Sequence, residues 1–160
     1  TAHALPLARP AASHFGVSSG FGMRRDPFTR RPALHGGLDF RTPTGTPIRA
    51  AGPGRVTIAS YRGGYGNLVE IDHGNDVTTR YAHLNSIAVE KGQFVATGEH
   101  IGRAGSTGRS TGPHLHYETR IGDTPVDPQR FLRAGRRLER HLADQGIKPP
   151  GAPVRPGTAE

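Results

Sequence analysis

Short runs of β-branched residues, separated by glycine- and proline-containing turns, constrain this chain more than any other feature. Between Val17 and about Val126, segments such as GRVTIAS (54–60), NLVEIDH (67–73) and VTTRYAHL (77–84) alternate with turn sequences such as YRGGYG and HGND. β-branched residues favour extended backbone, whereas glycine and asparagine favour tight turns. The 23 glycines and 14 prolines also indicate many short strands. We therefore predict a mostly β fold, built as a compact antiparallel sheet or barrel-like sandwich.

A three-residue repetition between positions 89 and 101 supports the same fold class. A helix would place apolar neighbours at spacings of three and four, and glycines would weaken it. Tight turns alternating with very short strands fit the spacing better. The repeating positions are Val89, Gly92, Val95, Gly98 and Ile101.

One α-helix is expected, near the C-terminal end of the chain. Asp127 can cap it, Pro128 suits its first position and Gly146 can end it. The last residues are rich in proline and poor in large apolar groups, which is typical of a disordered segment. We therefore expect a loose lead-in at 1–16, a β domain at 17–132, a helix extension at 133–146 and a disordered tail at 147–160.

The formal net charge of +8 at pH 7 favours anionic partners, such as nucleic acid, an acidic membrane or an anionic cell-wall polymer. Charge alone does not choose among these. The absence of cysteine excludes disulfides and thiolate metal sites. No segment approaches the roughly 18 apolar residues of a membrane-spanning helix, so we expect no membrane insertion. No secretory signal is visible, and a start at Thr1 suggests a mature fragment.

Two histidines in PHLHYE (113–118) are the first candidates for chemistry. The run-in GSTGRSTG predicts a strand entered from a glycine-rich loop, and residues i and i+2 of a strand share one side. His114 and His116 would then stand side by side. Paired imidazoles suit a metal ion, but a catalytic zinc usually takes three protein ligands from His, Asp or Glu. The pair therefore needs further ligands from elsewhere in the chain.

The segment LHGGLDF (34–40) offers two more candidate ligands, His35 and Asp39. A helix would place these two residues on one face, but Gly36 and Gly37 argue against a helix. We expect instead a loop that bends into the strand LDF. Such a bend would let His35 fold back over the same point as Asp39.

His83, in the predicted strand 77–84, is the remaining candidate. Strict alternation would place His83 on the same face as Thr79 and Tyr81, so that Tyr81 either supports His83 or packs in the core. His73 lies in the turn sequence DHGN, and we interpret it as part of a hairpin turn rather than of a site.

These segments occur together and in a fixed order. The chain contains HxxxD, then YAHL, then STGPHLH, and with SSGFGMRRDPF and GYGNLVEIDHGN around them it resembles the lysostaphin-type (LytM-like) zinc metallopeptidases, which cut peptidoglycan. The resemblance runs from about Val17 to Leu132. It implies that residues 17–132 form a zinc peptidase domain whose loops wall a substrate groove.

By this resemblance, His35, Asp39 and His116 are the zinc ligands, and His83 and His114 are a catalytic pair that does not bind the metal. Two neutral imidazoles and one carboxylate leave the ion a net positive charge, which acidifies its bound water. The sequence has no HExxH motif and thus lacks the usual glutamate base. Two spare imidazoles could take the water proton and stabilise the oxyanion, and which one does which stays open.

The resemblance also implies a substrate, a location and a form of regulation. The substrate would be a peptidoglycan stem peptide or cross-link, with a D-Ala to diaminopimelate bond as first choice and a glycyl bridge as second. Peptidoglycan lies outside the cytoplasmic membrane, so the domain would be exported to the bacterial cell envelope. Regulatory segments upstream are a further expectation.

Three other readings are open. An inactive wall-binding module that activates other peptidoglycan hydrolases would show gaps at the ligand positions, and this sequence has none. A cupin-like iron oxygenase suits HxH but not the upstream HxxxD or the STGPHLH run. Nucleic-acid binding would favour a basic helical motif and more aromatic residues than the four tyrosines and six phenylalanines present.

Overall fold

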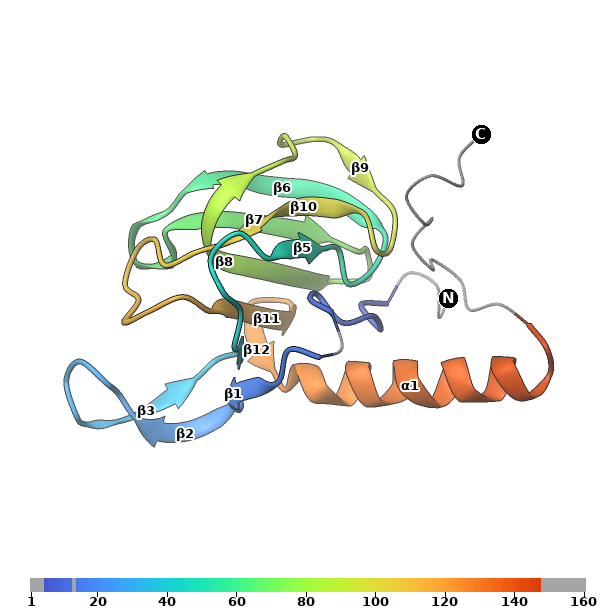
Figure 1. Cartoon of the computed structure of the whole chain (residues 1–160), viewed down its shortest axis with the longest axis horizontal. Coiled ribbons are helices and arrows are strands. Elements are labelled where there is room, and N and C mark those ends of the chain that lie inside the picture. The colour runs from blue at the N-terminus through green and yellow to red at the C-terminus, as the bar shows by residue number, and fades with distance from the viewer. Residues whose placement is uncertain (1–4, 13, 148–160) are drawn as a thin grey trace.

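The computed structural model describes residues 5–12 and 14–147 (Figure 1). All but the first residue of the predicted tail at 147–160 therefore lies outside the described residues. The strands are β1 (Val17–Ser19), β2 (Gly22–Arg25), β3 (Pro32–His35), β4 (Leu38–Phe40), β5 (Pro47–Arg49), β6 (Gly54–Tyr61), β7 (Asn67–Asp72), β8 (Val77–Ile87), β9 (Phe94–Val95), β10 (His100–Ala104), β11 (Leu115–Ile121) and β12 (Thr124–Val126). A 3₁₀ turn covers Gly63–Tyr65, and the α-helix α1 covers Pro128–Asp144.

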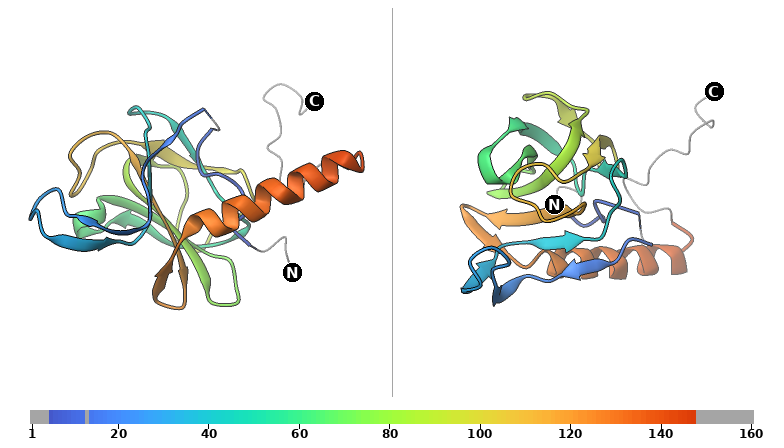
Figure 2. Two further views of the ribbon diagram at one scale, coloured as in Figure 1. Left: turned by 90° about the horizontal axis from the view of Figure 1, so that it is seen from below. Right: turned by 60° about the vertical axis from the view of Figure 1, so that its left-hand side comes forward.

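Most strands belong to one antiparallel sheet, in the order β1, β4, β11, β8, β7, β6 and β9. β10 pairs with both β8 and β5, and β12 pairs with β11. β2 and β3 form a separate hairpin, which projects from one end of the molecule while α1 extends toward the other (Figure 1). The large sheet is curled, with α1 below it (Figure 2). The prediction of a mostly β, antiparallel fold with one C-terminal helix is confirmed.

The hydrophobic core lies against one face of β11. Leu115, Tyr117 and Thr119 are fully buried there, and the Tyr117 ring packs on Tyr81 of β8 at a centroid distance of 5.3 Å. Because successive side chains of a strand point to opposite faces, His116 lies on the other side of β11. One face of this strand therefore builds the core, and the other is available for chemistry.

The segment from residue 89 to 101 alternates short strands and turns, as its three-residue repetition predicts. Val89, Val95 and Ile101 are buried in the core. Gly92 and Gly98 lie between them with φ of 93° and 83°, which is backbone that glycine adopts without strain. Each turn therefore reverses the chain, and each apolar residue anchors it.

The lead-in segment differs from the expectation of a loose one over residues 5–12. Pro10 and Ala11 are buried, and Ala11 belongs to the core. The Ala8 N–H donates to the carbonyl of Ala51 at 2.9 Å, and the Arg49 N–H donates to the carbonyl of Pro10 at 2.9 Å. The sequence of residues 5–12 has no helix-like or strand-like repetition of apolar residues. The segment packs instead through backbone hydrogen bonds, which a sequence pattern does not reveal. The domain boundary at residue 17 stays a prediction.

The helix begins where its capping residues predict. The Asp127 side chain accepts a hydrogen bond from the Gln129 N–H at 3.0 Å, and Pro128 takes the first helical position. Gly146, with φ of 71°, follows the end of the helix. The Asp127 side chain thus pairs with a backbone N–H at the start of the helix that has no partner within the helix. Gly146 allows the chain to turn away at the other end.

The N-terminal half of α1 packs on the rest of the molecule. Leu132 is buried, and a Cβ placed on Gly135 would lie 2.1 Å from the Leu7 carbonyl oxygen, so only glycine permits this close approach. Beyond residue 138 most side chains are exposed. Within the described ranges, no helix combines the length and apolar character needed to cross a bilayer.

Candidate functional site

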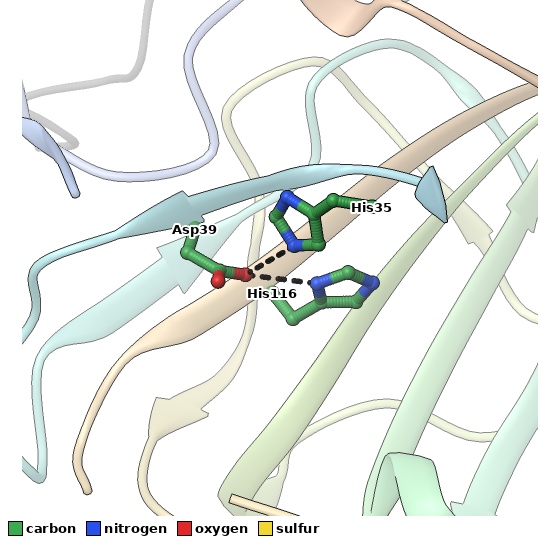
Figure 3. A group of neighbouring side chains, drawn as sticks. All are labelled: His35, Asp39 and His116. Carbon is green, nitrogen blue, oxygen red and sulfur yellow. Dashed lines mark hydrogen bonds and ion pairs between the residues drawn. The ribbon is translucent and has the colours of Figure 1, made fainter. Parts of the chain in front are cut away.

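His35, Asp39 and His116 meet at one point on the outer face of β11 (Figure 3). His116 and Asp39 are register partners across the β11–β4 pair, which places their side chains on the same face. The Asp39 Oδ1 atom lies 3.2 Å from His35 Nε2 and 2.9 Å from His116 Nδ1. The three potential ligand atoms all lie within 4.8 Å of one another. The three residues predicted as metal ligands are thus brought together.

A two-glycine link carries the chain from His35 to the strand of Asp39. We expected His35 to lie in a loop, but it is the last residue of β3. The connection to β4 consists only of Gly36 and Gly37, and the chain bends there. A Cβ on Gly37 would lie 2.4 Å from the Tyr117 carbonyl oxygen and 3.0 Å from His116 Cε1. Only glycine can run this close to β11, which is how His35 folds back over Asp39.

The remaining ring nitrogens of the two histidines are already engaged. His35 Nδ1 lies 2.7 Å from the Gly20 carbonyl, and a carbonyl oxygen can only accept, so Nδ1 carries the hydrogen. His116 Nε2 donates to Glu118 Oε1 at 3.0 Å. In their neutral forms, both rings therefore direct a lone pair toward Asp39. With metal–ligand bonds of about 2.0–2.1 Å, tetrahedral neighbours lie about 3.3 Å apart, close to the two distances from Asp39 Oδ1, and two imidazoles with one carboxylate are a donor set that fits Zn²⁺.

The electrostatics of this cluster favour a positive charge. Burial alone would raise the pKa of Asp39 and lower the pKa of His116. Hydrogen bonds from His116 and His35 outweigh burial and hold the pKa of Asp39 well below its usual value. Hydrogen bonds to Asp39 and Glu118 likewise raise the pKa of His116 to about 9. The two carboxylates therefore stabilise a positive charge at His116. That charge is carried either by a second proton on the ring or by a metal ion bound at Nδ1, beside Asp39.

His83 reaches the same site through an irregularity in β8. The strand carries one extra residue between the pairs that Tyr81 and Leu84 make with β7, and His83 has φ of 59°. The prediction that His83 shares a face with Tyr81 is wrong, because this bulge turns His83 onto the outer face while Tyr81 stays in the core. The His83 ring centroid lies 4.9 Å from that of His114 and 5.9 Å from that of His116.

His83 and His114 each use Nδ1 to hold a backbone carbonyl. His83 Nδ1 donates to the Thr107 carbonyl at 2.8 Å, and His114 Nδ1 donates to the Gly112 carbonyl at 2.8 Å. When neutral, both rings therefore keep a lone pair on Nε2, and that atom of His114 lies 3.8 Å from Asp39 Oδ1. Burial lowers the pKa of His83 to about 4, although its bond to Thr107 opposes this effect, so the ring is neutral at pH 7.

His73 and Tyr81 belong to a separate hydrogen-bonded chain in the interior. The Ala51 N–H donates to the Tyr81 hydroxyl at 3.0 Å, and Tyr81 lies 2.8 Å from Thr79 Oγ1. Thr79 Oγ1 lies 2.8 Å from His73 Nε2, and His73 Nδ1 donates to the Pro53 carbonyl at 2.7 Å. Every donor meets an acceptor when His73 is neutral. His73 is therefore placed outside the site, as its turn sequence indicates.

Two residues of the site were missed by sequence reasoning. Glu118 is buried behind His116, and the hydroxyl of Tyr65 donates to Glu118 Oε1 at 3.0 Å. Glu118 follows His116 by two positions, so strand alternation could have identified it. Tyr65 comes from the turn between β6 and β7, and no sequence pattern links it to β11.

The site lies in a groove of about 730 Å³. One wall is the β2–β3 hairpin and the other is the loop between β10 and β11. The Arg109 guanidinium joins the two walls, because it pairs with Asp26 at 3.1 Å and lies 4.3 Å from the Phe28 ring centroid. Residues of the metal-ligand cluster and residues 26–28 at the hairpin tip both line this groove.

Comparisons with known proteins agree with this geometry. Residues 33–128 match the model of peptidase family M23. Over 122 residues, the chain is 47% identical to the peptidoglycan DD-endopeptidase ShyA of Vibrio cholerae, covering 76% of this chain and 28% of that protein. A solved zinc-containing peptidase from Vibrio cholerae superposes with a TM-score of 0.70 and 41% identity, covering 77% of this chain and 38% of the other.

The catalytic domain of lysostaphin from Staphylococcus simulans superposes with a TM-score of 0.69 and 31% identity, over 74% of this chain and 92% of that domain. The resemblance inferred from HxxxD, YAHL and STGPHLH is thereby confirmed. The chain spans between 26% and 28% of the length of the curated relatives that match it at 52% and 47% identity. Matching the family model over more than half of its length, the chain belongs to peptidase family M23.

Proposed function

We propose that this chain is a zinc-dependent endopeptidase that hydrolyses peptide bonds in peptidoglycan stem peptides or cross-links. The observation that carries this proposal is the convergence of His35, Asp39 and His116 beside two further histidines in an open groove. The similarity to ShyA, which is named a peptidoglycan DD-endopeptidase, supports the choice of substrate.

The metal ligands would be His35 Nε2, Asp39 Oδ1 and His116 Nδ1. Three protein ligands would leave a coordination position for water, as is usual in catalytic zinc sites. When bound, Zn²⁺ supplies a Lewis acid and an acidified water molecule. The Gly20 carbonyl and Glu118 hold the outer nitrogens of the two imidazoles, so the ligand atoms stay directed at the ion.

His83 and His114 would carry the proton transfers. Each ring has its hydrogen on Nδ1 and therefore offers a free Nε2 acceptor when neutral. The ring that accepts the water proton becomes an imidazolium, and only this form can donate from Nε2 to the oxyanion or to the leaving amine. The low pKa of His83, which burial causes, keeps this ring unprotonated at pH 7 but also makes it a weak base, so the choice of first proton acceptor between His83 and His114 stays open.

An extended peptide would lie along this groove, with its scissile carbonyl over the metal ligands. A D-Ala to diaminopimelate cross-link is the first choice of bond and a glycyl bridge the second. Because peptidoglycan lies outside the cytoplasmic membrane, the proposed site of action is the bacterial cell envelope, periplasmic or extracellular. Regulation by segments upstream of this domain stays a prediction.

An inactive wall-binding module is the alternative. That reading needs at least one ligand position to be lost, yet all three predicted ligand positions are filled by side chains of the right chemistry. Both additional histidines also line the groove. The alternative is therefore not favoured.

Digestion of purified peptidoglycan tests the proposal. Zinc-loaded protein should convert cross-linked muropeptides into uncross-linked ones, and the new termini identify the bond. Asp39→Ala, which removes the carboxylate between the two imidazoles, is the inactive control. Wild-type protein that holds one zinc ion per chain and yet leaves cross-linked muropeptides and free stem peptides intact would contradict it.

A further inference from the structure

Glu118 is a buried carboxylate whose two oxygen atoms have different partners. Its side chain is 6% exposed, and Oε1 accepts the Nε2–H of His116 at 3.0 Å. Oε2 accepts the Nε–H of Arg120 at 3.0 Å. A buried carboxylate that served only as the counter-ion of Arg120 would not need a second oxygen directed at an imidazole.

Glu118 is itself held by two further side chains, Tyr65 and Arg120. The Tyr65 hydroxyl lies 3.0 Å from Oε1 and 3.3 Å from Oε2 of Glu118. Arg120 donates to the Tyr65 oxygen at 3.1 Å, and the Arg80 guanidinium lies over the Tyr65 ring at 5.3 Å. Hydroxyl and guanidinium donors from two separate elements therefore fix the carboxylate in one orientation.

Gly37 packs closely against the His116–Glu118 pair. A Cβ on Gly37 would come within 3.0 Å of both Glu118 Cγ and His116 Cε1, so the glycine link packs directly over the pair. The hydrogen bond to Glu118 determines which nitrogen of the neutral imidazole carries the hydrogen. When a metal ion replaces the proton on Nδ1, the hydrogen that remains is the one on Nε2 facing Glu118, and the Nδ1 lone pair on the Asp39 side is left for the metal.

From this geometry we infer that Glu118 is a positioning residue for the metal centre, held in place by Tyr65 and Arg120. It fixes the tautomer and the ring orientation of His116 and makes Nδ1 a stronger ligand. Hydrogen-bond acceptors behind ligating histidines have this effect in metal sites generally, and their loss weakens metal affinity by about 10- to 100-fold. The inference rests on the proposed ligand set His35, Asp39 and His116.

The test measures zinc affinity of the metal-free chain by competition with a coloured chelator, without any reference to catalysis. Glu118→Leu removes the acceptor at similar volume, and Glu118→Gln keeps an acceptor without the charge. Glu70→Gln is the matched control, because Glu70 pairs with Arg80 at 2.6 Å and, among the described residues, forms no hydrogen bond or ion pair with a histidine. We expect zinc affinity to fall about 10- to 100-fold in Glu118→Leu, less in Glu118→Gln and less than twofold in Glu70→Gln.

A second measurement reports on His116 directly. Nitrogen NMR of the zinc-loaded wild-type protein should show the hydrogen of His116 on Nε2. In Glu118→Gln, the hydrogen bond made by this Nε2–H should be weaker. Glu118→Gln also keeps the test possible if Glu118→Leu does not fold. Zinc affinity within twofold of wild type in a folded Glu118 variant overturns the inference, as does an equal loss in Glu70→Gln. His116→Ala distinguishes failure of this inference from failure of the proposed ligand set. If His116→Ala keeps its zinc, the ligand set itself is wrong.

Discussion

Two largely buried histidines, His73 and His116, lie on either side of β8 and have opposite properties. His73, at the end of β7, contacts a carbonyl and a hydroxyl, and burial lowers its pKa. His116, in β11, contacts the carboxylates of Asp39 and Glu118, which outweigh burial and raise its pKa to about 9. Burial is common to both, so the charge of the partners decides whether a histidine forms part of a cation site.

The network around His73 supports the fold, whereas the cluster around His116 forms the candidate metal site. The chain of hydrogen bonds through His73 is satisfied within the protein and leaves no atom for a ligand. The cluster around His116 brings three ligand atoms together at one point, and its carboxylates favour a positive charge there. Variants of the two networks should therefore fail in different ways, one in stability and the other in metal binding.

The largest expected effect is that of metal removal. A chelator should abolish peptidoglycan cleavage, because water at a site without metal keeps its ordinary pKa, and one equivalent of Zn²⁺ per chain should restore the rate. Elemental analysis accompanies the rate measurement. Iron as the native, activity-supporting metal would overturn the zinc peptidase proposal.

The next effect concerns the two histidines that are proposed not to bind metal. His83→Ala and His114→Ala should each keep nearly one zinc per chain and lose about 10²–10³ in rate, or roughly 3–4 kcal/mol of barrier. The double variant should lose less than the sum if the two rings act as a unit. Rates and zinc content of the three variants, measured together, check this. Fully additive losses would argue that the rings act independently.

A smaller effect should follow from breaking the interior network. His73→Leu leaves the Pro53 carbonyl and the Thr79 hydroxyl without their partner, so the free energy of unfolding should fall by about 1–3 kcal/mol in urea denaturation. Zinc content should not change. His141→Leu, at an exposed position of α1, is the control and should shift stability by less than about 0.5 kcal/mol. Loss of zinc from His73→Leu would show that the two networks are coupled.

The smallest effect is a pH dependence of stability. The folded-state pKa of His73 lies below its usual value of 6.5, because burial outweighs the nearby Asp72 charge. Below about pH 6.5 the unfolded chain therefore binds a proton that the folded chain does not, and stability falls as the pH falls. The stability advantage of wild type over His73→Leu should shrink between pH 7 and pH 5. An advantage that grows over this range would contradict the assignment.

Much of the candidate site was accessible from the sequence because its spacing is local. Strand alternation places His114 and His116 together, and the glycine link brings His35 near Asp39, whatever the rest of the fold does. Glu118 was within reach of the same argument, since it follows His116 by two residues. The mostly β fold followed from short β-branched runs and glycine turns, and the structure bears it out.

What the sequence could not reveal depends on tertiary contacts. The bulge at His83 places its ring against the Thr107 carbonyl, which comes from the distant loop between β10 and β11. Tyr65 reaches Glu118 across 53 positions of sequence. The packing of residues 5–12 rests on backbone groups such as the Ala51 carbonyl, which no side-chain pattern records. Each of these three features depends on a contact with a residue far away in the sequence.

The most direct test of the account is the zinc content of two variants of the PHLHYE segment. His116→Ala should lose its zinc, because it removes a ligand nitrogen 2.9 Å from Asp39 Oδ1. His114→Ala should keep about one zinc per chain, because the nearest approach of His114 to that carboxylate is 3.8 Å and its Nδ1 is bonded to the Gly112 carbonyl. Loss of zinc from His114→Ala together with full zinc in His116→Ala would contradict the proposed metal centre.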